Sequence, residues 1–162
     1  MTDIAEERWS DAAAALAPLF HQQHLELSDP RYIARLPLDV DWEMFARLEE
    51  TGHLLLVVAR EEGQIVGYTI TFLHTHPHYR TARMAHVDTY WLHPDHREPG
   101  DDSLDHLAST GAMLIMETEE LAAKRGAVKM ILHTRLWKDN QRLFTLLGFA
   151  EVERLSTKWI GG

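Results

Sequence analysis

Residues 90–126 read YWLHPDHREPGDDSLDHLASTGAMLIMETEELAAKRG, and this stretch decides which fold we expect. An apolar strand leads into HPDHR at residues 93–97, a polar loop containing glycine follows, and a long amphipathic helix ends at Gly126. A strand, a loop and a helix N-terminus in this order expose backbone N–H groups and the positive end of a helix dipole. The arrangement predicts a site for a phosphate-bearing cofactor.

Composition limits the protein class further. The chain has 162 residues, 45% of them hydrophobic, which predicts one domain. It lacks cysteine, so we expect no disulfide and no thiolate site. We expect a cytoplasmic protein, because the acidic N-terminus MTDIAEERWSD does not resemble a signal peptide and no apolar run would span a membrane. The net charge of −9 argues against a nucleic-acid partner. It suits a cationic small molecule or a basic peptide, or it serves solubility alone.

The N-terminal part of the chain predicts two helices. Apolar residues recur at three- and four-residue steps over residues 4–27, although Pro18 predicts a kink or a break. Asp41 is suited to cap a second helix over residues 42–50, which Gly52 ends.

The remaining chain predicts strands with two further helices. A hairpin joins strands at 54–59 and 65–73 through the turn Glu62-Gly63. The other predicted elements are a strand at 83–92, a helix at about 111–125, a short buried strand at 128–132, a helix at 138–147 closed by Gly148, and a final strand at 149–159. This order predicts an α/β domain whose mixed, mostly antiparallel sheet is flanked by helices on both faces. We expect a single domain over 1–162, with a helical acceptor-side region at 1–52 and a sheet and cofactor-binding core at 53–162.

Three local features, taken in order, resemble one protein family. HPDHR at 93–97 resembles the end of the family's fourth strand, AAKRG at 122–126 the end of its following helix, and LFTLLGF at 143–149 a signature near its C-terminus. Over about residues 40–160 the chain therefore resembles the GCN5-related N-acetyltransferases, the GNAT superfamily. The stretch from residue 78 to residue 88 is also similar to a compact subgroup of that family common in tailed-phage genomes.

The resemblance implies an acyl-CoA-dependent enzyme. It implies transfer of an acetyl group from acetyl-CoA directly to a primary amine of a small molecule or peptide, with no metal and no enzyme nucleophile. Backbone N–H groups near the cofactor would stabilise the oxyanion, and homodimers are common in the family. The alternative is a catalytically inactive relative that kept the fold as a binding or interaction module.

The predicted pyrophosphate loop departs from the family pattern. Arg97 and Gly100 fit R-x-x-G, but Asp102 occupies the place of the second glycine, whereas Gly111 has the expected spacing from the helix end. We therefore place an insertion between Glu98 and Ser109, with the phosphates at the helix start; a degraded cofactor site is the other interpretation. The residues that the resemblance implies for cofactor binding are Trp91, Leu92, Arg97, Gly100, Ser109, Thr110, Gly111, Ala112, Asn140 and Phe144.

Candidate catalytic residues lie on the strand at 83–92. His86, Asp88 and Tyr90 alternate, which predicts that they project from one face of the sheet. We expect Asp88 or His86 to act as the base. The family's usual general acid, a tyrosine, is replaced by Phe144, so Tyr90 is a substitute candidate. The other interpretation is that the three are ordinary polar groups on a solvated face.

Two further groups of residues attract attention. His74, His76 and His78 alternate, but Pro77 interrupts them and no ligand spacing is recognisable, so no metal is expected. The basic residues expected near the CoA phosphates, apart from Arg97, are Lys124, Arg125, Lys138 and Arg142.

Overall fold

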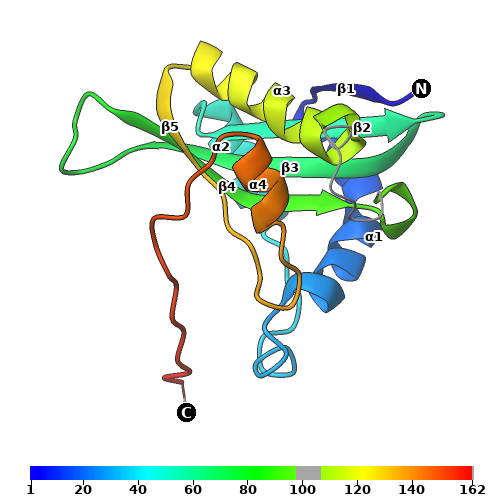
Figure 1. Ribbon diagram of the computed structural model, residues 1–162. Helices are drawn as coiled ribbons and strands as arrows, with labels where there is room; N and C mark the ends of the chain where they lie inside the picture. Colours follow the sequence, from blue (N-terminus) through cyan, green and yellow to red (C-terminus); the bar gives the residue numbers. More distant parts are fainter. Residues whose placement is uncertain (98–106, 162) are drawn as a thin grey trace.

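The protein is described by a computed structural model that covers residues 1–97 and 107–161 (Figure 1). Its sheet has the order β1-β2-β3-β4-β5, with antiparallel pairing up to β4 and a parallel pair of β4 with β5. The strands are β1 (Asp3–Glu6), β2 (Leu54–Glu61), β3 (Gln64–Thr75), β4 (Arg83–Leu92) and β5 (Ala127–Ile131).

Helices lie on both faces of this sheet, as predicted (Figure 1). On one face are α1 (Trp9–Leu27) and α2 (Trp42–Glu50); on the other are α3 (Thr110–Lys124) and the short α4 (Gln141–Leu146), and the 3-10 helix η1 (Pro94–His96) follows β4. Among the described residues, no helix combines the length and the apolar character that crossing a bilayer requires.

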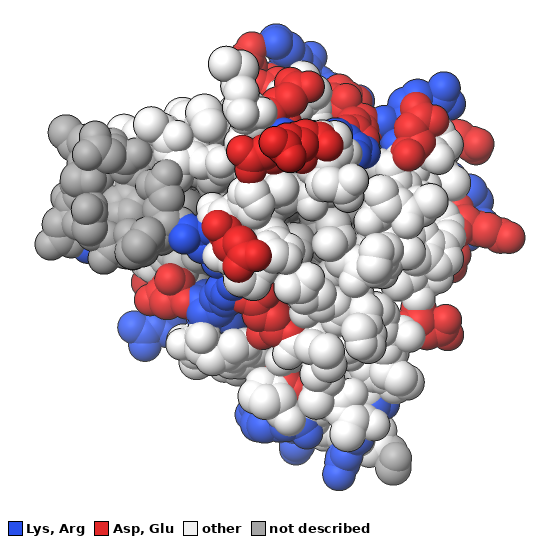
Figure 2. All heavy atoms as spheres, turned by 90° about the vertical axis from the view of Figure 1, so that its right-hand side faces the viewer, with Lys and Arg blue, Asp and Glu red and all other residues white. Residues whose placement is uncertain are grey.

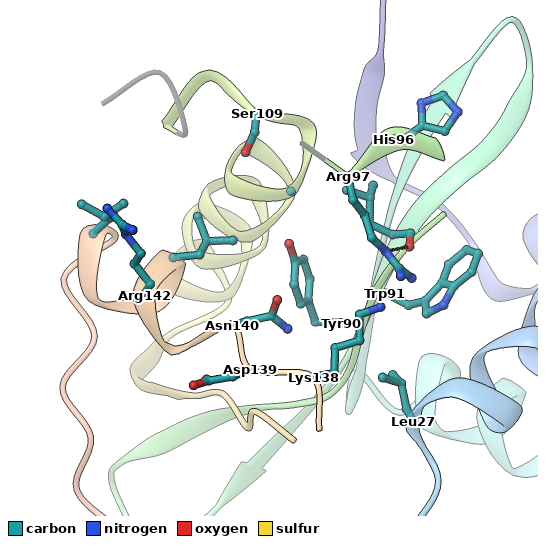
Figure 3. Close-up of a pocket in the computed structure, with 14 residues that line it drawn as sticks. Leu27, Tyr90, Trp91, His96, Arg97, Ser109, Lys138, Asp139, Asn140 and Arg142 are labelled. Atoms are coloured by element: carbon teal, nitrogen blue, oxygen red, sulfur yellow. Dashed lines mark hydrogen bonds between the residues drawn. The ribbon is translucent and has the colours of Figure 1, made fainter. Parts of the chain in front are cut away.

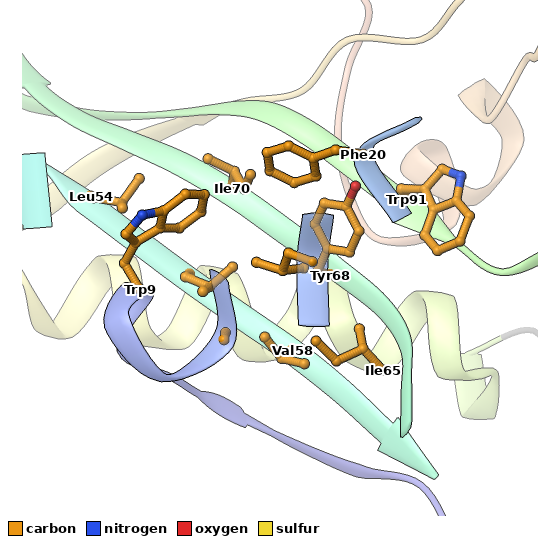
Figure 4. Close-up of a cluster of buried hydrophobic side chains, with 11 residues drawn as sticks. Trp9, Phe20, Leu54, Val58, Ile65, Tyr68, Ile70 and Trp91 are labelled. Atoms are coloured by element: carbon orange, nitrogen blue, oxygen red, sulfur yellow. The ribbon is translucent and has the colours of Figure 1, made fainter. Parts of the chain in front are cut away.

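The core beneath α1 is built from aromatic and branched side chains. Figure 4 shows Trp9 and Phe20 of α1 over Tyr68 and Ile70 of β3, with Trp91 of β4 at the side. Phe20 and Tyr68 are in ring contact, with centroids 5.7 Å apart. Burying large apolar side chains provides most of the free energy that holds a helix on a sheet.

The opposite face packs against α3. Leu55, Val57 and Leu73 meet Leu114 and Ala122 of the helix. This second core keeps the first turn of α3 close to the end of β4.

Local signals predicted several elements correctly. The Asp41 side chain caps α2 by accepting a hydrogen bond from the Met44 N–H at 2.8 Å. Glu62 and Gly63 both have positive φ, 50° and 82°, as expected for a two-residue hairpin turn. The boundaries of α2 and β4 agree with the predicted ranges.

The N-terminal prediction was partly wrong. Ile4 was assigned to a helix, but residues 3–6 form β1 and pair with β2, so the helix begins at Trp9. Pairing with an available strand edge overrides weak local periodicity. The helix continues through Pro18 without a break, because that residue lies on the exposed side, where the carbonyl that loses its partner can reach water. The predicted region 1–52 therefore also contributes a strand to the sheet.

The C-terminal prediction also needs correction. Residues 149–161 form no strand, and β5 is half-exposed rather than buried. The tail packs on the segment before α2 instead, since Trp159 lies against Tyr32 with ring centroids 5.7 Å apart and under the Arg35 guanidinium. The helix predicted over 138–147 is shorter and spans Gln141–Leu146.

Candidate active site

The site begins where β4 and β5 separate. Their parallel pairing runs from Arg83 with Ala127 to His86 with Ile131 and stops there, whereas β4 continues to Leu92. Within residues 1–97 and 107–161, no strand pairs with this edge of β4 beyond His86. The second half of β4 thus presents backbone groups to a ligand.

A bulge in β4 changes which side chains share a face. The register with β3 shifts between Ile70 and Thr71, so Asp88 is an extra residue without a partner. His86 consequently faces the α1 side, opposite Phe72, while Tyr90 faces the α3 side, opposite Thr69. The prediction that His86, Asp88 and Tyr90 project from one face was therefore wrong, because a bulge interrupts strand alternation.

A pocket of about 360 Å³ lies between β4, α3 and α4 (Figure 3). Of the predicted cofactor-binding residues it brings together those at the end of β4, at the start of α3 and before α4, namely Trp91, Leu92, Arg97, Ser109, Gly111 and Asn140. Leu27, His96 and Asp139 also line it and were not predicted. Gly100 lies outside the described residues.

Tyr90 stands in the middle of this pocket, with its hydroxyl directed toward the first turn of α3 (Figure 3). A Cβ atom at Gly111 would collide with that hydroxyl, so the close approach requires glycine. The buried Phe144 packs edge-on against the Tyr90 ring, with centroids 6.1 Å apart. Burial raises the pKa of Tyr90 to about 12, against a smaller lowering effect of Arg97, so the phenol keeps its proton at neutral pH.

The side chain of Ser109 caps the start of α3. The Ser109 Oγ accepts a hydrogen bond from the Ala112 N–H at 3.2 Å, and Ala112 is fully buried. The predicted phosphate contact of Ala112 therefore needs correction, because the cap already satisfies its amide. The amides of Thr110 and Gly111 have no acceptor within the helix and are the better candidates for anion binding.

Glu26, at the end of α1, forms ion pairs with two cations of the pocket, Arg97 and Lys138. Its carboxylate makes a two-pronged pair with Arg97, at 2.6 and 2.7 Å, and a further ion pair with Lys138. The same carboxylate accepts a hydrogen bond from Trp91 Nε1 at 3.0 Å. Burial lowers the pKa of the Lys138 ammonium, which lies beside the Glu26 carboxylate. Nothing in the local sequence pattern distinguished Glu26 from a solvated residue on an amphipathic helix.

The predicted basic residues divide into two groups. Lys138 and Arg142 line the pocket. Lys124 and Arg125 lie at the opposite end of α3, where they pair with Glu120 and Glu6, so their predicted place near the phosphates was wrong. The linear order of the chain did not show that the end of α3 lies far from its start in space.

The candidate base His86 has a neighbour that the sequence did not reveal. Its Nε2 lies 2.6 Å from Nε2 of His133, which follows β5. Burial and the charge of His133 lower the pKa of His86, while Asp88 acts in the opposite direction. Among the described residues, no three histidine, aspartate or glutamate side chains converge to hold a metal ion.

The comparisons with known proteins agree with this architecture. The model of the acetyltransferase (GNAT) family matches residues 16–100, about half of the chain. The chain belongs to the GNAT family. No curated protein matches the sequence.

Solved GNAT structures share the fold at low sequence identity. The ribosomal-protein-alanine N-acetyltransferase from Brucella melitensis biovar Abortus 2308 has a TM-score of 0.72 and 23% identity, with 100% of this chain and 99% of that one covered. The glucosamine-6-phosphate N-acetyltransferase from Arabidopsis thaliana has a TM-score of 0.70 and 14% identity, with 99% of each chain covered. AAC(6')-Iy, solved with the bisubstrate analogue CoA-S-monomethyl-acetylneamine, has a TM-score of 0.67 and 17% identity over 100% of this chain and 99% of that one.

Proposed function

We propose that this GNAT protein is an N-acetyltransferase that moves the acetyl group of acetyl-CoA to a primary amine. The observation that carries the proposal is the pocket in which the half of β4 that does not pair with β5, the start of α3 and several cations meet around Tyr90. Acetyl-CoA would supply the activated acetyl group as a thioester, and the amides and cations of the pocket suit its phosphates.

The cradle for the phosphates has suitable chemistry. The amides of Thr110 and Gly111 lie at the positive end of a helix dipole, and Lys138 and Arg142 add charge from the other wall. Arg97 was expected to bind phosphate directly. Its guanidinium donates to Glu26 and to the Leu92 carbonyl, at 2.7 Å, so we propose that it mainly shapes the end of β4.

The chemical groups for transfer lie on β4. His86 or Asp88 would take the proton that the attacking ammonium loses. The Tyr90 hydroxyl lies against Gly111, where the phosphates would sit, so the departing thiolate, at the other end of the cofactor arm, would take its proton from water. The Tyr90 ring packs against Phe144, which stands where the family resemblance implies a tyrosine as the acid.

The acceptor would approach from the side of α1 and α2, which His86 faces. On the face shown in Figure 2, acidic and basic side chains are interspersed, so there the net charge does not form one acidic surface. The solved relatives are named for acceptors as different as ribosomal protein alanine and glucosamine 6-phosphate. We propose a small-molecule or peptide amine, and a cytoplasmic location and a homodimer remain predictions.

Thermal unfolding with and without acetyl-CoA tests binding. Saturating cofactor is expected to raise the melting temperature by several degrees, because a ligand at about 100 times its Kd stabilises by about 2.7 kcal/mol. No shift at millimolar acetyl-CoA would overturn the proposal.

A turnover assay distinguishes an enzyme from the alternative, an inactive binding module. The replacement of the expected tyrosine by Phe144 favours that alternative. Free thiol release is followed over polyamines, amino acids, aminoglycosides and peptides. An enzyme releases thiol with at least one of them and loses that activity in Asp88→Asn or His86→Ala while still binding acetyl-CoA. Binding without release over the whole panel would instead identify an inactive module.

A further inference from the structure

Two histidines meet where the parallel strands separate. His86 belongs to the last residue pair of the β4–β5 ladder, and His133 follows two residues after its partner Ile131. Their Nε2 atoms are 2.6 Å apart and their ring centroids 4.8 Å apart. His86 is half-buried, whereas His133 is exposed.

This contact restricts the protonation states of the pair. Two imidazole nitrogens at hydrogen-bond distance require one N–H donor and one lone-pair acceptor. Two charged rings at this distance would repel each other, so the pair holds one extra proton at most. A half-buried member bonded to an exposed member is the arrangement that a proton path to water needs.

We propose that His133 is a relay residue that carries the proton of the acceptor amine from His86 to solvent. The inference rests on the proposed acetyltransferase function and adds a residue to it. His86 would act as the catalytic base, and His133 would act through His86 without touching the substrate.

The proton balance is complete in this scheme. As the amine nitrogen forms its bond to the acetyl carbon, its proton passes to His86 Nδ1, the ring nitrogen that His133 leaves available. The proton on His86 Nε2 moves to His133 Nε2, and His133 releases its Nδ1 proton to water. Proton exchange with water then returns both rings to their starting tautomers. The carbon–sulfur bond of acetyl-CoA would break, and the thiolate would take a proton from water.

The surroundings tune the relay. Asp88 on β4 favours the charged form of His86, whereas His74 on β3 and His133 oppose it. Burial of His86 has the largest effect and lowers its pKa, so the ring is neutral and able to accept a proton near neutral pH.

Steady-state kinetics of His133→Gln test the relay once an acceptor amine is found. We expect kcat to fall at least tenfold in dilute buffer while the KM values for both substrates change less than twofold. Added imidazole should restore most of the loss, because a mobile base can replace a missing relay. The matched control is His78→Gln, an exposed histidine of the β3–β4 connection, which should behave like the unaltered chain.

The titration of His86 gives a readout that does not depend on turnover. The imidazole NMR signals of His86 follow its titration in the unaltered protein and in His133→Gln. In His133→Gln the pKa of His86 should rise, since the repulsion from His133 is lost, and the acidic limb of kcat/KM should move to higher pH with it.

The outcomes are distinguishable. Turnover that is the same in His133→Gln and in the unaltered chain, or a loss that imidazole does not restore, would overturn the relay alone. A titration of His86 that is the same in His133→Gln as in the unaltered protein would also overturn it. Absence of turnover in the unaltered chain with every amine would overturn the proposed function, and the relay with it.

Discussion

The pocket depends on the absence of a side chain at Gly111. It lies in the first turn of α3, and the Tyr90 hydroxyl occupies the space that a Cβ atom would need. Sequence spacing from Gly126 predicted a cofactor-binding role for Gly111, but the structure supplies another reason for a glycine here. The glycine lets a strand side chain come up against a helix N-terminus.

The variant Gly111→Ala is expected to destabilise the protein by about 1–3 kcal/mol, as overpacked sites do. The double variant with Tyr90→Phe should recover most of this loss, because the next nearest atoms, Tyr90 Cζ and Leu92 Cδ2, lie at an ordinary 3.7 Å from the added Cβ. Urea unfolding of both variants and of Tyr90→Phe alone measures the coupling. Additive effects of the two changes would contradict the collision.

The Tyr90 phenol predicts a loss of stability in alkali. Its pKa is about 12 in the folded protein, above the ordinary value near 10. The stabilisation from the protonated phenol is therefore complete below about pH 10 and is lost as the pH rises toward 12. The loss of unfolding free energy reaches about 1 kcal/mol by pH 11. Unfolding free energies at pH 9 and pH 11 should show a smaller drop in Tyr90→Phe than in Tyr79→Phe, whose ring is exposed. Equal drops would contradict the assignment.

At the scale of elements, Glu26 joins three segments that are distant in sequence. It lies at the end of α1 and holds Arg97 after β4 and Lys138 before α4. The Glu26 carbonyl also accepts a hydrogen bond from Trp137 Nε1 at 3.2 Å. Helix α1 and the pocket between β4, α3 and α4 are thereby joined to each other.

Glu26→Gln is expected to lower the free energy of unfolding by about 1–3 kcal/mol, because two partly buried cations lose their counter-charge. The matched control is Glu43→Gln, which removes an exposed pair with Arg47 at 3.6 Å and should cost less than about 0.5 kcal/mol. Denaturant unfolding of both variants provides the comparison. Similar small losses in the two would show that Glu26 is not a structural junction.

At the scale of the whole molecule, the C-terminal tail is held away from the sheet. Its anchors are the contact of Trp159 with Tyr32 and a hydrogen bond from Arg31 to Thr157 at 3.0 Å. The apolar residues Val152 and Leu155 remain about three-quarters exposed. Tail and core are therefore expected to differ in local stability.

Trp159→Ala is expected to speed tryptic cleavage after Arg154 and Lys158 several-fold, with little change in the melting temperature of the core. Ile160→Ala, at a side chain that is 91% exposed, is the control. Mass spectrometry of the fragments over time measures the effect. Equal cleavage rates in the two variants would show that Trp159 does not anchor the tail.

Much of this architecture follows from signals that are short in sequence. The Asp41 cap, the Glu62-Gly63 turn and the apolar run of β4 act over a few residues, and each element was predicted where it is found. The order of these elements then implied the mixed sheet and the family. Local backbone preference and hydrophobic periodicity are properties that a sequence displays directly.

The remainder depended on contacts between distant residues. The bulge at Asp88 comes from the register with β3, so no alternation in β4 alone could show that His86 and Tyr90 face opposite sides. Glu26 meets Lys138, and His86 meets His133, only because the chain folds back on itself. Strand register and charge pairing are settled by packing and desolvation over long range, and these energies exist only in the assembled molecule.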